Sequence, residues 1–264
     1  MVAYDDRTRN WMADLFQITE VTSPHASLAK ILEDQTTILE KLRWFGADFP
    51  KFFPNYGPGI IASFLGSVPH FVPGTTWFEP LPVETLAEMQ PYFNPENTWW
   101  RRIYDLTALA VERWSGQVAV AHTDIGGNLD ILAHMRGTER LLTDLSDSPE
   151  EVLRITEQIT RLWRIYYDEL YTAYHGAAFG TCGWSPLWAP GRYYMLQSDF
   201  SYMISPRMFT RFVLPDLRAC CDALDYPFYH LDGPGQLRHL DILLGIPNLR
   251  GIQWIPGAGQ PPRG

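Results

Sequence analysis

Residues 227–257 read PFYHLDGPGQLRHLDILLGIPNLRGIQWIPG. A short apolar strand ends in Asp-Gly-Pro-Gly, an amphipathic helical segment follows, and a second apolar strand, LRGIQWI, ends in Pro-Gly. Strand, polar glycine loop and helix in this order are typical of parallel βα units. This stretch therefore predicts an α/β fold built on a parallel sheet.

The same unit recurs upstream, where hairpin signals are few. Ser148-Pro149-Glu150-Glu151 predicts a helix start, because it offers a cap, a first-turn proline and first-turn acids. We expect helices over 99–114, 128–145, 148–175 and 205–224, with strands inside 116–127, 177–188 and 194–203. Residues 1–45 have helical spacing, and 66–98 are expected to be irregular with a short strand near Thr76 to Phe78.

Two motifs that would favour an open nucleotide-binding sheet are missing from the sequence. Neither G-x-G-x-x-G after a strand nor G-x-x-x-x-G-K-[ST] occurs. A (β/α)8 barrel of the TIM type is therefore preferred, as one domain over 1–264 with a helical segment at about 1–45. The sequence stops ten residues after Trp254, so we expect a barrel without its last βα unit, or a fragment.

Composition narrows the class of partner. The net charge of -9 and the lack of clustered Lys and Arg argue against nucleic acid, and no apolar run approaches the roughly 20 residues of a membrane span. The three cysteines do not suggest a disulfide framework, and the first residues lack a secretion signal. We expect a cytoplasmic protein whose partner is a small molecule.

Polar residues follow several of the predicted strands, at the end where a barrel forms its active site. His230 and Asp232 are two apart on one strand, so both side chains point the same way and could reach one metal ion or one substrate. Asp199 could accept a proton or orient a hydroxyl or cationic group. The remaining candidates would contact substrate: Asp124, Asn128, Tyr229, Gln253 and Trp254.

Each candidate also has a purely structural interpretation. His230 could be a buried histidine bonded to backbone or to Asp232, while Asp199 and Asp232 could cap turns. Asp124 and Asn128 flank Gly126-Gly127, which permits either a ligand contact or an ordinary turn. Cys182 lies at a strand end and is a weaker candidate, and Trp184, Trp188, Tyr193 and Tyr194 could line a planar ligand or fill the core.

Three segments together resemble the uroporphyrinogen decarboxylase superfamily, which includes methyltransferases acting on corrinoid proteins and methylated thiols. They are TDIGGNLDILAHMRGTERLLTDLSDSPEEVLRITEQIT, SDFSYMISPRMFTRFVLPDLRA and YHLDGPGQLRHLDILLGIPNLRGIQWIPG, and the likeness runs from about Phe49 to Pro262. The resemblance implies a (β/α)8 barrel. In the methyltransferase branch a His-x-Cys and a later Cys hold zinc; here His230 matches the His and Asp232 stands in place of the Cys.

The resemblance implies two activities. The leading hypothesis is a methyltransferase or demethylase that moves a methyl group between a small methylated compound and a thiol or a corrinoid carried by a partner protein. His230 and Asp232 would bind zinc or polarise the acceptor. Decarboxylation of a porphyrinogen in tetrapyrrole biosynthesis ranks second, because no Arg-rich loop for its carboxylates is evident near the amino terminus. A ligand-binding barrel without catalysis is the third hypothesis.

Overall fold

The computed structural model describes residues 3–4, 14, 16–22 and 26–257. Its strands are β1 (Ala3–Tyr4), β2 (Leu42–Arg43), β3 (Lys51–Phe52), β4 (Val68–Val72), β5 (Thr75–Glu79), β6 (Ala119–Val120), β7 (Thr181–Cys182), β8 (Trp188–Ala189), β9 (Tyr193–Leu196), β10 (Tyr226–Asp232) and β11 (Gly251–Ile255).

Helices separate most of these strands. They are α2 (Thr19–Thr22), α3 (Leu28–Lys41), α4 (Ile61–Phe64), α5 (Thr98–Trp114), α6 (Asn128–Arg136), α7 (Thr138–Asp147), α8 (Pro149–Ala173), α9 (Gly176–Phe179), α10 (Pro206–Phe212), α11 (Leu214–Ala223) and α12 (Leu240–Leu244). Three short 3-10 helices are η1 (Leu86–Glu88), η2 (Asp199–Met203) and η3 (Pro234–His239).

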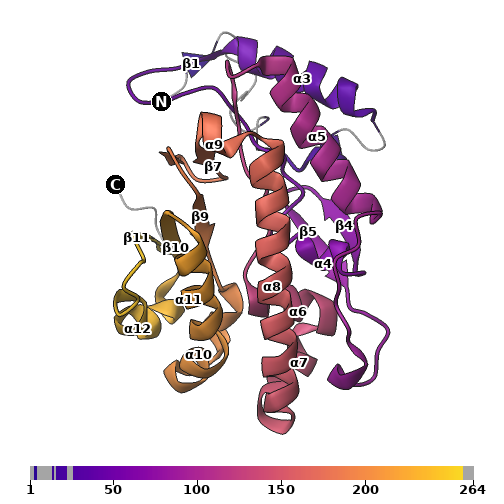
Figure 1. The fold of residues 1–264 in the computed structure, drawn as a ribbon, viewed down its shortest axis with the longest axis vertical. Coiled ribbons are helices and arrows are strands. Elements are labelled where there is room, and N and C mark those ends of the chain that lie inside the picture. Colours follow the sequence, from indigo (N-terminus) through magenta and orange to yellow (C-terminus); the bar gives the residue numbers. More distant parts are fainter. Residues whose placement is uncertain (1–2, 5–13, 15, 23–25, 258–264) are drawn as a thin grey trace.

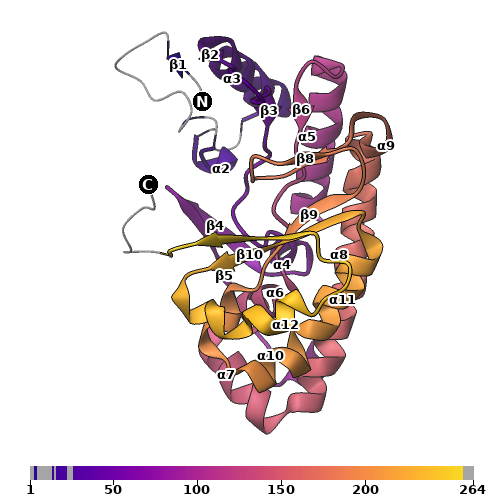
Figure 2. The ribbon, with the colours of Figure 1, turned by 90° about the vertical axis from the view of Figure 1, so that its left-hand side faces the viewer.

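The main strands run parallel and neighbour one another in chain order. β9, β10 and β11 form a parallel three-stranded sheet, shown side by side in Figure 2, and β3 pairs in parallel with β6. The backbone N–H of His122, just after β6, donates to the carbonyl of Cys182 in β7 at 2.8 Å, and β7 lies beside β9. Within the described residues β11 does not pair with β3, so a closed barrel stays a prediction.

Two antiparallel hairpins interrupt this parallel arrangement. β4 pairs with β5 in the region expected to be irregular, and β7 pairs with β8. The expected short strand at 76–78 is therefore real but belongs to a hairpin that the sequence interpretation missed. Its Thr76 hydroxyl donates to the Tyr56 carbonyl at 2.9 Å, which attaches the hairpin to the loop after β3.

Helix α8 is the longest element and runs along the long axis of the molecule (Figure 1). It begins as predicted, with Pro149 in its first turn and two acids beside it, although the Ser148 side chain makes no capping hydrogen bond. Its buried face carries Trp163, whose Nε1 donates to the Gly126 carbonyl at 2.9 Å. The helix thereby fixes the glycine loop that follows β6.

Two predicted long helices are each divided. The helix expected over 128–145 breaks at Gly137, whose φ of +89° is unfavourable for other residues, into α6 and α7. The helix expected over 205–224 breaks at Val213, just before Pro215, into α10 and α11. The helical segment expected at 1–45 is reduced to α2 and α3, and part of it lies outside the described residues.

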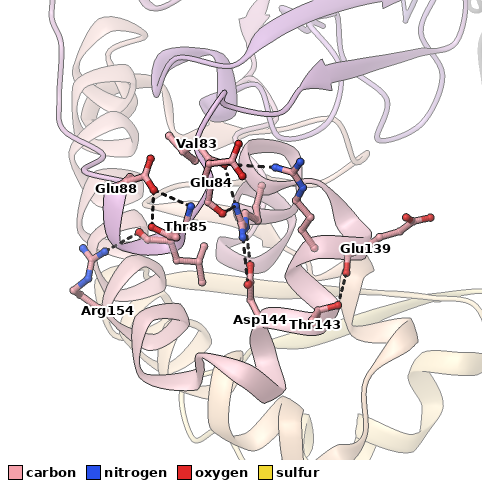
Figure 3. Close-up of polar contacts among 11 residues, drawn as sticks. Val83, Glu84, Thr85, Glu88, Glu139, Thr143, Asp144 and Arg154 are labelled. Atoms are coloured by element: carbon pink, nitrogen blue, oxygen red, sulfur yellow. Dashed lines mark hydrogen bonds and ion pairs between the residues drawn. The ribbon is translucent and has the colours of Figure 1, made fainter.

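The segment between β5 and η1 is held against α6 and α7 by polar contacts. Arg136 is 7% exposed and donates to Asp144 at 2.7 Å and to the carbonyls of Val83 and Glu84 at 3.2 and 3.0 Å. Figure 3 shows Val83 and Glu84 opposite Asp144, with the reciprocal contacts of Thr85 and Glu88 alongside. These contacts fix the carboxyl end of α6, the helix whose first turns border the candidate site. In the described part of the chain, no helix has the length and apolar character needed to span a membrane.

Candidate functional site

Strand β10 carries its residues on two different faces. Pro227, Tyr229 and Leu231 are buried, whereas Phe228, His230 and Asp232 alternate with them and are partly exposed. Because successive side chains of a strand point to opposite faces, His230 and Asp232 share one face, as predicted, and Tyr229 lies on the other. The strand therefore presents an imidazole and a carboxylate together at its carboxyl end.

His230 is oriented by the neighbouring strand. It pairs in register with Gln253 of β11, and its Nδ1 lies 2.7 Å from Gln253 Oε1. The edge of the Trp184 ring lies against the imidazole, with the ring centres 5.0 Å apart. An amide oxygen only accepts hydrogen bonds, so Nδ1 carries the hydrogen and Nε2 is left as an acceptor.

Asp199 begins η2, shortly after β9 ends, and is exposed. It lies at the edge of the sheet where β9, β10 and β11 reach their carboxyl ends, which is called the rim below. The surrounding protein raises the pKa of its carboxyl, the charge of Asp232 raises it further, and His230 lowers it. These interactions join Asp199 to the two β10 side chains. The carboxyl ends of β9, β10 and β11 thus bring together four of the predicted residues, Asp199, His230, Asp232 and Gln253.

Asp124 lies in the loop after β6 and is held by donors on several sides. Its Oδ1 accepts from the Gly126 backbone at 2.9 Å and from the Tyr194 hydroxyl at 3.1 Å, and Gln197 Nε2 lies 3.4 Å from Oδ2. Burial nonetheless raises its pKa to about 6, and the charge of Asp199 adds to the rise. Asp124 therefore adjoins the same rim through Gln197, and it also stabilises its own glycine turn.

The other sequence candidates do not join this group. Tyr229 is 1% exposed, and its hydroxyl donates to Gln236 of η3 at 3.2 Å. Trp254 pairs in register with Leu231, on the helix-facing side, and packs against the main core. Asn128 is 3% exposed and its amide lies 3.5 Å from the Phe212 carbonyl of α10. Strand alternation, and the packing of α6, turn these three away from the rim.

Two residues that the sequence interpretation missed border the rim. Asp130 accepts the backbone N–H groups of Asp199 at 3.0 Å and of Phe200 at 2.8 Å, so it holds the start of η2. Burial and the charge of Asp199 raise its pKa. His134 lies one helical turn further along α6, and burial lowers its pKa to about 4, which leaves it neutral. Their i, i+4 spacing on a helix that follows a polar strand tip was the signal available in the sequence.

A cavity of about 260 Å³ opens between these residues. Its wall includes Asp130, His134, Gln197, Asp199, Phe200 and Met203, with Pro58 and Gly59 across from them. None of the described residues that line it is Lys or Arg. The cavity therefore offers hydrogen-bond acceptors and apolar surface to a small molecule.

The predicted zinc ligands do not form a complete site. His230 and Asp232 share a face, and Asp232 Oδ1 is buried without a hydrogen-bond partner among the described residues. No group of three His, Cys, Asp or Glu side chains suited to a metal ion occurs in the part of the chain that the structure describes. Two protein ligands are fewer than the three or four that zinc sites use. The donor set therefore does not fit zinc.

The cysteines are free and buried. Burial raises the pKa of the Cys182 thiol to about 11, so the thiol stays protonated at neutral pH and is a poor nucleophile. Cys220 and Cys221 pack in the core from α11.

Taken together, the described residues form a mixed helix-and-strand fold whose parallel strands β9, β10 and β11 carry polar side chains at their carboxyl ends. Among solved structures, the chain is similar to a methyltransferase from Methanosarcina mazei, with a TM-score of 0.61 and 10% sequence identity. The match covers 85% of this chain and 61% of that one, so this chain spans about three fifths of the neighbour's length. At this identity the likeness is one of fold. No protein family model matches the chain, and no curated protein matches it by sequence.

Proposed function

We propose that this protein is a methyltransferase that moves a methyl group between a small methylated compound and a thiol or corrinoid acceptor. The similar fold of a methyltransferase supports the general activity. The observation that carries the proposal is the 2.7 Å contact between His230 Nδ1 and Gln253 Oε1, because it leaves Nε2 ready to accept a proton at a rim that also holds Asp199.

The scaffold we propose is a (β/α) barrel. Its support is the parallel sheet of β9, β10 and β11, the parallel pair β3 and β6, the hydrogen bond from His122 after β6 to β7, and the position of β7 beside β9. Barrel enzymes carry their active sites at the carboxyl ends of the strands. The rim with Asp199 and His230 has that position.

In the proposed reaction His230 Nε2 takes the proton of a thiol acceptor, with Asp232 on the same face to stabilise the resulting imidazolium. The thiolate sulfur then forms a bond to the methyl carbon. The bond from that carbon to its leaving atom breaks, and its electron pair stays on the leaving atom. A protonated amine donor departs as a neutral amine, whereas an oxygen or sulfur leaving atom takes the proton that His230 holds, and Asp199 orients the donor. No step passes through a metal, since the donor set does not fit zinc. A corrinoid on a partner protein is the second acceptor class of this proposal.

Porphyrinogen decarboxylation is less well supported. A substrate with many carboxylates requires cationic partners, and the 260 Å³ cavity is lined by carboxyl, amide and imidazole groups with no Lys or Arg. Its volume is also just below the roughly 300 to 1,000 Å³ of pockets for drug-sized ligands, whereas a tetrapyrrole is larger than such ligands.

The cytoplasm remains our predicted location, because the three free cysteines suit a reducing compartment.

The proposal can be tested with donors that carry a ¹³C-labelled methyl group. Purified protein is incubated with methanol, methylammonium or dimethyl sulfide as donor and with 2-mercaptoethanol or cob(I)alamin as acceptor, and NMR follows the labelled methyl group. We expect a methyl thioether or methylcobalamin to form from at least one donor. Saturable binding of a donor without any product would contradict the proposal and favour a ligand-binding barrel.

A further inference from the structure

The cavity beside Asp199 differs in chemistry from an ordinary apolar pocket. Gln197 is 6% exposed and lines it, its Nε2 donates to Asp124, and its Oε1 receives no hydrogen bond within the described part of the chain. Asp199 contributes a carboxylate at the mouth, next to Met203. Within the described residues, two acceptors without a hydrogen-bond partner on the cavity side therefore border this space, Gln197 Oε1 and the Asp199 carboxylate.

The remaining wall supplies no compensating positive charge. The imidazole of His134 makes no hydrogen bond to a described residue, and the Phe78 ring lies behind it at 4.6 Å between ring centres. Asp130 already accepts two backbone N–H groups, and burial and the charge of Asp199 raise the pKa of its carboxyl, which favours its uncharged form. The charge that attracts a cation is therefore that of the Asp199 carboxylate, and none of the described residues that line the cavity is Lys or Arg.

From this arrangement we infer that the cavity binds a small protonated alkylamine, whose N–H donates to the Asp199 carboxylate with Gln197 Oε1 beside it as a second acceptor. The alkyl groups would lie against Phe200 and Met203, which supply the apolar part of the wall. The inference rests on the proposed function for its biological meaning, because it names the methyl donor as an alkylammonium ion. The binding site itself requires no methyl transfer to be observed.

The acceptor geometry separates this ligand class from close relatives. Tetramethylammonium has the same charge as trimethylammonium but no N–H group, tert-butanol has similar size without charge, and pivalate has similar size with the opposite charge. Charge-assisted hydrogen bonds are stronger than neutral ones. We expect trimethylammonium to bind at least about 10-fold more tightly than each of the other three.

Isothermal titration calorimetry of the full chain with these four probes tests the inference. Asp199→Asn should weaken trimethylammonium binding at least about 10-fold, whereas Asp241→Asn, which removes an exposed carboxylate on α12, should leave it unchanged. Met203→Lys places a competing ammonium group at an exposed position of the mouth and should abolish binding without altering the core. Thermal melting checks that each variant is folded.

The outcomes distinguish the inference from the proposed function. Equal affinity for trimethylammonium and tetramethylammonium, or for trimethylammonium and pivalate, would overturn the inferred site. Ammonium-selective binding with no methyl transfer to any acceptor would contradict the proposed function and leave the site standing. Methyl transfer from a neutral donor, in a protein that binds no ammonium ion, would overturn the inferred site and leave the proposed function standing.

Discussion

At the scale of single residues, His230 depends on Gln253 for its chemistry. The 2.7 Å contact selects the tautomer with hydrogen on Nδ1, and that tautomer directs the free electron pair of Nε2 away from β11. Groups that orient a catalytic or metal-binding histidine commonly affect activity or metal affinity 10- to 100-fold. Gln253 is therefore a positioning residue in this account.

Gln253→Leu should remove the preference of the His230 ring for hydrogen on Nδ1. Gln253→Glu should keep this preference, because a carboxylate also accepts a hydrogen bond from Nδ1. We expect ¹⁵N NMR of the His230 ring at pH 8 to show hydrogen on Nδ1 in the native protein and in the Glu variant, but mainly on Nε2 in the Leu variant. The transfer rate of the Leu variant should fall about 10-fold or more. An unchanged tautomer in Gln253→Leu would contradict the positioning role.

Asp216 of α11 provides a pH test of the core, away from the rim. It is 6% exposed, accepts from the Thr160 hydroxyl at 2.6 Å, and burial raises its pKa to about 6. The unfolded chain loses this proton near pH 4, so between pH 4 and 6 the folded protein holds more protons and its stability falls as pH rises. The penalty can reach about 3 kcal/mol above pH 6.

Asp216→Asn keeps the shape and removes the ionisation. The change in the free energy of unfolding that Asp216→Asn causes, relative to the native protein, should be more favourable at pH 7 than at pH 4. Urea unfolding at both pH values measures it. Asp241→Asn is the control and should show no such difference. If Asp216→Asn changed the free energy of unfolding equally at both pH values, the pKa of the Asp216 carboxyl in the folded protein would not be raised, which would contradict the prediction.

Residue-level prediction from the sequence succeeded where strand alternation applied. His230 and Asp232 are two apart and share a face, whereas Tyr229, next to them, had to point to the helices. Asp130 and His134 were missed because they lie on a helix, where the sequence alone cannot say which face meets the rim. The packing of α6 against η2 decides that question.

At the scale of elements, Arg136 joins three segments. Its guanidinium contacts Asp144 of α7 and two carbonyls of the segment before η1, and it is almost wholly buried. Removing one partner of a buried ion pair leaves the other charge without compensation. Arg136 is therefore the buried one among the arginines that hold the segment shown in Figure 3; Arg140 and Arg154 donate to it from more exposed positions.

Arg136→Leu should lower the free energy of unfolding by about 3 kcal/mol or more. Arg161→Leu is a matched control, because Arg161 pairs with Glu157 on the exposed surface of α8 and such pairs contribute about 1 kcal/mol or less. Urea unfolding of both variants gives the comparison. Equal losses in the two variants would contradict the structural role of Arg136.

Element prediction failed mainly where turns were involved. The hairpins β4–β5 and β7–β8 are short excursions from a parallel pattern, and their antiparallel pairing is set by tertiary contacts such as that between Thr76 and Tyr56. Gly137 was visible in the sequence, but glycine is tolerated inside helices, so its φ of +89° could not be inferred. Strong periodicity did identify α5 and α8 with nearly correct bounds.

At the scale of the whole molecule, one large core cluster extends from Ile31 of α3 to Ile246 after α12. A shared core favours a single cooperative unit, as the sequence interpretation expected. Calorimetry should therefore show one unfolding transition, with far-ultraviolet circular dichroism and tryptophan fluorescence reporting the same midpoint. Two separated transitions would contradict the single-domain prediction.

Methyl transfer at the rim around His230 is measured by the transfer rate of His230→Ala under saturating donor and acceptor. We expect this rate to fall about 100-fold or more relative to the native protein, because general acid–base groups contribute 10²- to 10⁴-fold, while the exposed control Asn248→Ala keeps its rate. Equal rates for His230→Ala and the native protein would contradict this expectation.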